Sequence, residues 1–163
     1  MSNLLIPQIA ALAANAGFSG PDLATAVAVA LAESGGNPQA YNPERAAGAP
    51  DGQGSFGLWQ IYLHAHPEYA GQNLFDPQTN ALAAYAIYAA AGDTFRPWST
   101  FTAGAYLRHL DAVNQALAST DVTATADDST PPTDWGGPDG GQLLTLVVGG
   151  GILFYLISRV LGW

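Results

Sequence analysis

Glu33 is the residue of this 163-residue chain whose surroundings best suit acid–base chemistry. It ends the apolar stretch LATAVAVALAE, in which it is the only charged residue. Apolar surroundings and the partial negative charge at the C-terminal end of a helix both favour the protonated form of a carboxyl group. A carboxyl group that keeps its proton near neutral pH can act as a general acid. Judged by position alone, a solvated carboxylate that closes a helix end is the more common case.

A glycine-containing motif, GSFGLWQI, occupies residues 54–61 and is the second candidate. Gly54 and Gly57 leave room for a ligand to approach the backbone closely. Gln60 carries an amide donor and an amide acceptor, which suit a sugar hydroxyl or an N-acetyl group. By itself the motif predicts only a turn that leads into a helix.

Together, AESGGNPQAYNP and GSFGLWQI resemble the lytic transglycosylases and goose-type lysozymes of the lysozyme superfamily. The later segments LFDPQTNALAAY and PWSTFTAGAY are also similar to that family, the second of them to its phage-borne copies. The resemblance covers roughly residues 20–110. It implies a lysozyme-like helical fold. It also implies cleavage of the β-1,4 bond between N-acetylmuramic acid and N-acetylglucosamine in peptidoglycan.

The resemblance also implies a role for each matching residue. Glu33 would protonate the glycosidic oxygen and would then take the proton of the muramoyl C6 hydroxyl, which closes a 1,6-anhydro ring without water. Ser34 and Ser55 would orient Glu33, while Gln60 and the backbone at Gly57 would hold sugar.

Two aromatic residues complete the candidate site. Many family members have an A-x-Y-N-x-G motif whose tyrosine contacts the catalytic glutamate. Tyr106 is the nearest match, although Leu107 follows it where the family has asparagine, and it also fits a tyrosine packed on a helix. Trp98 and Trp59 are placed either to stack on a sugar or to fill the core.

Two alternatives to the transglycosylase remain open. A lysozyme that hydrolyses the bond needs a second carboxylate to position water, and the loop after Glu33 offers Glu44 and Asp51. An inactive structural or wall-binding protein with the same fold would also explain the acidic charge and the missing asparagine. The occurrence of Glu33 together with Ser34 and Gln60 favours an enzyme.

The composition excludes several other classes. Thirteen acidic residues oppose four arginines and no lysine, so the chain has no basic surface for nucleic acid. It has no cysteine, which excludes disulfides and thiolate metal sites. His64 and His66 are poorly spaced for one helical metal site and have no evident third ligand. We therefore predict that the protein needs no metal and no other cofactor.

The elements expected to position these residues are mostly helices. The first 17 residues predict a retained amphipathic helix rather than a signal peptide, because they lack a positively charged start. Further helices are predicted over residues 19–34, 54–66, 77–91 and 99–117, with a long loop over residues 35–57. We assign residues 1–117 to one mostly α, lysozyme-like domain.

The remaining residues predict a linker and a membrane anchor. Residues 118–141 are small, acidic and rich in proline and glycine, which is typical of a disordered linker. Residues 142–163 have one charge, Arg159, and predict a single C-terminal transmembrane helix. A helix over the apolar part would span roughly 28 Å, close to the thickness of a hydrocarbon core.

This organisation resembles the small anchored transglycosylases that phages with an internal membrane use to open the cell wall during genome entry. A virion protein assembles inside the cell and needs no export signal, so we expect the virion membrane, with the bacterial envelope as the alternative. The expected partners are peptidoglycan, a lipid membrane through residues 142–163, and other virion membrane proteins.

Overall fold

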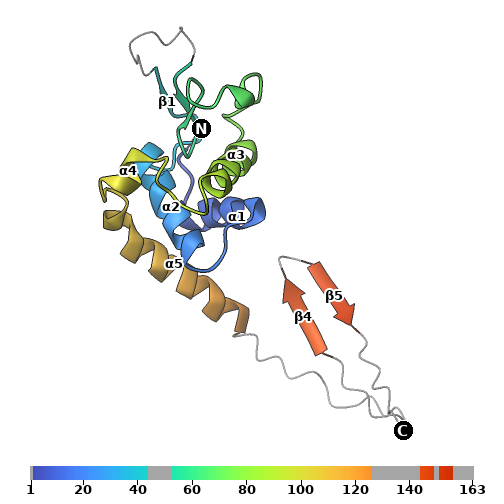
Figure 1. The fold of residues 1–163 in the computed structure, drawn as a ribbon. Helices are drawn as coiled ribbons and strands as arrows, with labels where there is room; N and C mark the ends of the chain where they lie inside the picture. The colour runs from blue at the N-terminus through green and yellow to red at the C-terminus, as the bar shows by residue number, and fades with distance from the viewer. Residues whose placement is uncertain (1, 44–52, 126–143, 149–150, 156–163) are drawn as a thin grey trace, which may run out of the picture. The chain divides into compact units, whose positions relative to one another are not determined.

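The structure is a computed structural model that describes residues 2–43, 53–125, 144–148 and 151–155 (Figure 1). The chain divides into two units, residues 1–127 and 128–163. Glu44 and Asp51 lie outside the described residues, as does most of the predicted linker.

The first unit is mostly helical, as predicted, and α2 is its central helix. Its helices are α1 (Ile6–Ala16), α2 (Gly20–Ser34), α3 (Pro77–Ala90), α4 (Ser99–Thr102) and α5 (Leu107–Thr125). Helix α2 contacts α1, α4 and α5, and α1 also contacts α3 (Figure 1). Residues 26–30, at the middle of α2, are buried on every side, which explains their composition of alanine and valine only.

The predicted starts and ends of the central helices are confirmed. Pro21 lies in the first turn of α2, where its missing N–H costs no hydrogen bond. Gly35 closes the same helix in the left-handed conformation, with φ 61°. Asp76 caps α3 and accepts hydrogen bonds from the backbone N–H and the hydroxyl of Thr79, both at 2.8 Å. These two bonds hold the pKa of Asp76 below its usual value.

The helix predicted over residues 54–66 is wrong. The segment contains two strands of an antiparallel sheet in the order β1 (Tyr41–Asn42), β2 (Ser55–Phe56) and β3 (Ile61–Tyr62). Gly57 and Gln60, between β2 and β3, have positive φ angles of 72° and 47°. A right-handed helix cannot contain such residues, so the chain reverses there instead. A short 3-10 helix, η1 (Pro67–Tyr69), follows the sheet.

The last predicted helix differs from the structure at both ends. Residues 99–117 were expected to form one helix, but the chain leaves the helix after α4 and adopts φ 72° at Gly104 before α5 begins. Helix α5 then continues to Thr125, so residues 118–125 are helical rather than linker. Elongation of an existing helix adds one hydrogen bond for each residue fixed and avoids the cost of nucleation, which favours the extension into a polar sequence.

The side chain of Asn80 ties the sheet to α3. It is fully buried, and its amide oxygen accepts a hydrogen bond from the backbone N–H of Trp59 at 2.9 Å. Its amide nitrogen donates to the carbonyl oxygens of Phe56 at 2.9 Å and Leu74 at 3.0 Å. A Cβ atom at Gly57 would collide with this amide and with the Leu74 carbonyl, so only glycine allows the turn to lie here.

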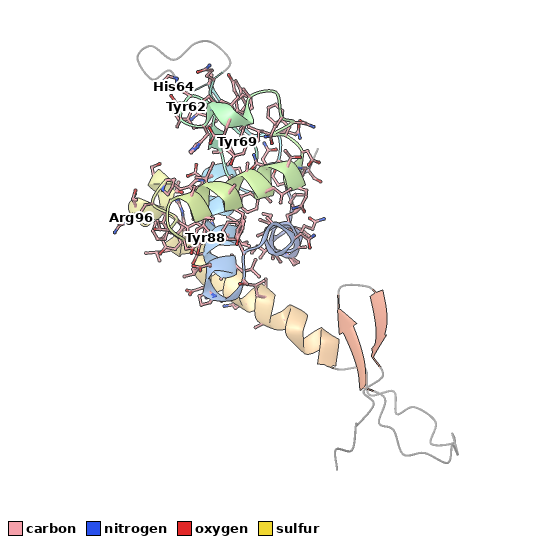
Figure 2. All side chains as sticks on the ribbon, turned by 45° about the vertical axis from the view of Figure 1, so that its right-hand side comes forward. Tyr62, His64, Tyr69, Tyr88 and Arg96 are labelled. Carbon is pink, nitrogen blue, oxygen red and sulfur yellow. The ribbon has the colours of Figure 1, made fainter. Side chains whose placement is uncertain are left out.

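A second polar contact joins α2 to α3. The hydroxyl of Tyr88 donates to a carboxylate oxygen of Asp22 at 2.8 Å. Burial and this hydrogen bond raise the pKa of Tyr88 to about 12, so the hydroxyl stays protonated at every physiological pH. Figure 2 shows Tyr88 on one side of α3, with Tyr62 and Tyr69 on the other, toward the sheet.

In the second unit, the structure describes two strands, β4 (Leu144–Val148) and β5 (Gly151–Tyr155), which pair antiparallel with Leu146 opposite Leu153. The single helix predicted for residues 142–163 is therefore wrong over these ten residues. Valine, isoleucine and aromatic residues favour strands, and the run of three glycines at 149–151 disfavours a helix. Among the described residues, no helix has both the length and the apolar character needed to cross a membrane.

Asn80→Ala is expected to lower the free energy of unfolding by about 3 kcal/mol or more, because it leaves one N–H and two carbonyl groups buried without their partner. Asn114→Ala, at an exposed position of α5, is the matched control and is expected to change it by less than about 0.5 kcal/mol. Urea denaturation followed by circular dichroism measures both. Equal stability of the two variants would contradict the role given to Asn80.

Candidate active site

A cavity of about 160 Å³ lies between the end of α2, the sheet and the start of α4. It receives residues from all three of these parts of the fold. The residues that line it are Glu33, Ser55, Gln60, Ile61, Tyr62, Ala65, His66, Ile87, Pro97, Trp98 and Ser99. Four residues predicted from the sequence, Glu33, Ser55, Gln60 and Trp98, are thus brought together.

Glu33 lies half-buried in the last turn of α2, at the wall of the cavity. One of its carboxylate oxygens, Oε1, accepts a hydrogen bond of 2.7 Å from the hydroxyl of Thr100. Thr100 belongs to α4, and α4 packs on α2, so the tertiary contact of two helices brings the donor to the carboxylate. The carboxyl group is therefore held in a fixed orientation beside the cavity.

Ser55 and Tyr62 enter the cavity from the sheet. They are directly opposite each other on β2 and β3, and directly opposed residues present their side chains on the same face. Ser55 is 3% exposed, while Tyr62 is half-buried. The hydroxyl oxygen of Tyr62 is buried, and no group in the described part of the chain forms a hydrogen bond with it.

Gln60 has a strained backbone, and part of its side-chain amide is already hydrogen-bonded within the protein. Its φ of 47° lies in the left-handed region that non-glycine residues rarely adopt, and such strain is often found at functional sites. Its amide nitrogen donates to the carbonyl oxygens of Gly57 at 2.9 Å and Ala40 at 3.2 Å. The sequence predicts that both the amide N–H and the amide oxygen of Gln60 bind sugar. Since the amide nitrogen is bonded to the backbone, the amide oxygen is the group left for a ligand.

Ser34 and Gly57 are two of the three predicted site residues that do not line the cavity. The Ser34 hydroxyl donates to the carbonyl oxygen of Ala30 at 2.9 Å and accepts from the N–H of Gly36 at 3.2 Å, so it completes the end of α2. Gly57 packs against Asn80, and its carbonyl oxygen accepts the Gln60 hydrogen bond, but Gly57 itself does not line the cavity. Both residues shape the walls of the site without lining it.

Of the aromatic candidates, Trp98 lines the cavity, while Trp59 and Tyr106 do not. Trp98 lines the cavity but is only 5% exposed, and its indole N–H donates to the carbonyl oxygen of Trp59 at 2.8 Å. Trp59 is fully buried, and its own indole N–H donates to the carbonyl oxygen of Ala26. Tyr106 stacks on Phe101 with ring centroids 4.9 Å apart and does not line the cavity. Trp59 thus fills the core, while the ring of Tyr106 packs on Phe101.

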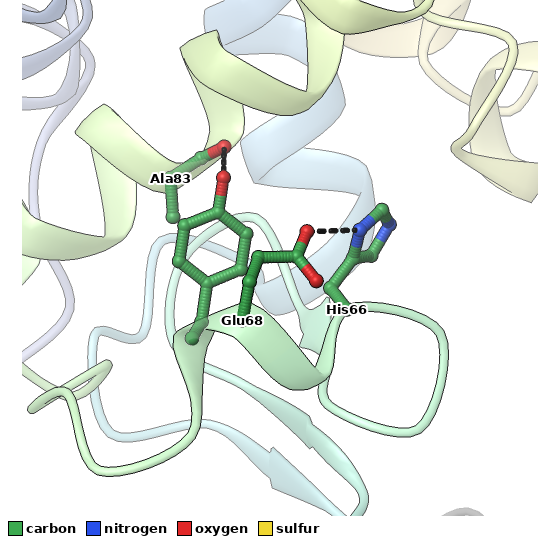
Figure 3. Close-up of polar contacts among 4 residues, drawn as sticks. His66, Glu68 and Ala83 are labelled. Carbon is green, nitrogen blue, oxygen red and sulfur yellow. Dashed lines mark hydrogen bonds and ion pairs between the residues drawn. The ribbon is translucent and has the colours of Figure 1, made fainter.

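A second cavity, of about 280 Å³, adjoins the first. The two share His66, Ile87 and Pro97 in their walls. At its edge, His66 Nδ1 lies 3.2 Å from a carboxylate oxygen of Glu68 (Figure 3). Nearby, the hydroxyl of Tyr69 donates a long hydrogen bond of 3.5 Å to the carbonyl oxygen of Ala83. The two cavities are therefore neighbours, with His66, Ile87 and Pro97 between them.

The sequence did not identify Thr100, Tyr62 or His66 as site residues. A signal was present for two of them, because Tyr62 directly follows the GSFGLWQI motif and Thr100 lies in PWSTFTAGAY. Their roles depend on contacts with residues distant in sequence, which no local pattern encodes. Within the described ranges, no group of three histidines or acidic residues is placed to hold a metal ion.

One comparison with known proteins identifies a family. A model of the family described as the lysozyme-like domain matches residues 10–100. That range contains Glu33, the motif at residues 54–61 and Thr100, and ends just inside α4. Searches of curated proteins and of solved structures find no match. The matched range is more than half of the chain, and the protein belongs to the lysozyme-like domain family, whose members act on peptidoglycan.

Proposed function

We propose that the protein is a lytic transglycosylase that cleaves the β-1,4 bond between N-acetylmuramic acid and N-acetylglucosamine and leaves a 1,6-anhydro end. One observation carries the proposal: Glu33 is the only carboxylate among the described residues that line the cavity. The intramolecular reaction needs a single carboxyl group as acid and then base. Inverting hydrolysis would need a second carboxylate on the opposite face of the sugar.

The chemistry proceeds in two proton transfers. The protonated carboxyl of Glu33 gives its proton to the glycosidic oxygen while the bond from that oxygen to the anomeric carbon breaks. The carboxylate then takes the proton of the C6 hydroxyl while the C6 oxygen bonds to the anomeric carbon. The proton is returned to Glu33, and no water is consumed.

Thr100 positions Glu33 for both steps. A hydroxyl donor at 2.7 Å fixes one carboxylate oxygen and stabilises the ionised form that exists between the two transfers. The substrate is a polymer, and the adjoining second cavity gives the glycan strand space to continue beyond the site of cleavage. No step in this scheme uses a metal or another cofactor.

We also propose that the C-terminal segment holds the domain at a membrane. The support is compositional: residues 142–163 have a single charge, Arg159. The resemblance to phage-borne enzymes favours the membrane of a virion and local opening of the cell wall during genome entry, with other virion membrane proteins as neighbours. The bacterial envelope is the second setting.

Glu33→Gln is expected to abolish cleavage, because the amide has no proton to give and cannot accept one. The full-length protein and the variant are incubated with purified peptidoglycan, and the products are weighed by mass spectrometry. The expected products of the parent protein are muropeptides that end in 1,6-anhydro-N-acetylmuramic acid. Asp111→Asn, at an exposed position of α5, is the matched control and is expected to remain active.

The other outcomes of this experiment are informative. Reducing ends in place of anhydro ends would make the protein a hydrolytic lysozyme and would direct attention to Glu44 and Asp51. If the folded parent protein does not cleave peptidoglycan, the enzymatic proposal is wrong, and the protein is a structural or wall-binding one.

Thr100→Val is expected to lower kcat about tenfold with little change in KM, since it removes one hydrogen bond to the catalytic carboxyl group. Thr100→Ser keeps the hydroxyl and is expected to recover most of the activity. Thr102→Val, in the same short helix, removes a bond from Thr102 to the Ser99 backbone and serves as the control. Initial rates of muropeptide release report the values. A Thr100→Ser protein as slow as Thr100→Val would contradict the positioning role.

The full-length protein is expected to float with phosphatidylcholine vesicles in a density gradient. Replacing both Leu146 and Leu153 by aspartate places two charges in the apolar segment and is expected to leave the protein at the bottom. Thr133→Asp, in the predicted linker, is the control and is expected to float. Flotation of all three proteins would show that the C-terminal segment is not the anchor.

A further inference from the structure

The hydroxyl of Tyr62 is an unexplained polar group in the wall of the catalytic cavity. Its oxygen is buried, and no donor or acceptor in the described residues reaches it. The ring is held from one side by the ring of His64, with centroids 5.8 Å apart. Buried polar groups in folded proteins almost always have a partner, so this one requires an explanation.

Burying a hydroxyl without a hydrogen bond costs free energy, because the group loses its bonds to water. Phenylalanine would fill the same volume without a polar group to desolvate, and no contact within the described residues offsets the cost of burying the Tyr62 hydroxyl. A group that enters the cavity meets the Tyr62 side chain, because this residue lines its wall. A ligand with a hydrogen-bond acceptor would therefore supply the missing partner.

The neighbouring polar groups indicate the chemical class of that ligand. The amide nitrogen of Gln60 is bonded to two backbone carbonyls, which leaves its side-chain oxygen as an acceptor at the same cavity. The hydroxyl of Tyr62 can turn its hydrogen toward an acceptor. One acceptor and one donor together match an acetamido group, which has one N–H and one carbonyl oxygen.

We propose that Tyr62 binds the substrate by donating a hydrogen bond to the acetamido carbonyl oxygen of an N-acetylated sugar, while Gln60 accepts the N–H of an acetamido group. This inference rests on the proposed function, since it names the group by which the same cavity selects its glycan. Tyr62 is thereby a specificity-determining residue, distinct from the acid–base role of Glu33.

The test measures sugar binding and stability in the same pair of proteins. Binding is measured by calorimetry in the Glu33→Gln protein, which does not turn over, with and without Tyr62→Phe. The two probes are the β-1,4 tetramer of N-acetylglucosamine and the β-1,4 tetramer of glucose, which lacks acetamido groups. Tyr62→Phe is expected to lower the preference for the acetylated tetramer about tenfold. The free energy of unfolding is expected to stay equal or to rise.

Tyr41→Phe is the matched control, because Tyr41 is 45% exposed on β1, the opposite edge strand of the same sheet. It is expected to change neither the preference nor the stability.

Each other outcome overturns the inference. Equal losses for both tetramers would show that the hydroxyl does not read the acetamido group. Unchanged binding with lower stability would show that the hydroxyl has a structural partner such as a bound water. If Tyr62→Phe leaves binding unchanged while the protein that keeps Glu33 cleaves peptidoglycan, this inference is wrong and the proposed function stands. A protein that neither binds the acetylated tetramer nor cleaves peptidoglycan would lose both.

Discussion

The three hydrogen bonds of Asn80 are the constraint on which the site depends. They connect a helix to the backbone of Phe56 in β2, of Trp59 in the following turn and of Leu74 just before α3; the bonds to Trp59 and Leu74 are buried and the bond to Phe56 is partly buried. Because a buried polar group without a partner is costly, the turn between β2 and β3 has essentially one position relative to α3. Gly57 permits this approach, and the positive φ of Gln60 follows within the same turn. The motif that carries the family resemblance is therefore mainly a structural device that sets one wall of the cavity.

The opposite wall of the cavity is formed by the end of α2, which apolar packing holds in place. Helix α2 has small side chains around its buried middle, so neighbouring helices pack closely on it, and its polar end emerges at the cavity. Glu33 gains its half-buried position from this arrangement, and α4 brings Thr100 to it. A rigid helix end and a hydroxyl from a second helix hold the carboxyl group more firmly than a loop would.

Two residues at the cavity depart from the usual preferences for backbone conformation and for hydrogen bonding of buried groups. Gln60 adopts a conformation that its residue type disfavours, and Tyr62 buries a hydroxyl for which the described part of the chain offers no partner. Both departures lie at one cavity, next to Glu33. Proteins usually tolerate such costs at functional sites, where a ligand or a reaction makes use of them. The clustering agrees with the family assignment, which rests on independent evidence.

The sequence by itself determined the helices that have strong periodicity and clear caps, and it placed Glu33 at the end of α2. These features depend on residues within a few positions of one another, so local patterns suffice. Only the tertiary structure decided that residues 54–66 contain strands, that Ser34 completes a helix end, and that Thr100 reaches Glu33. Residues 33 and 100 meet because helices pack, and the pairing of the strands depends on a buried amide at residue 80. Contacts across such distances in the chain are fixed by the packing of the whole domain, which no single stretch of sequence contains.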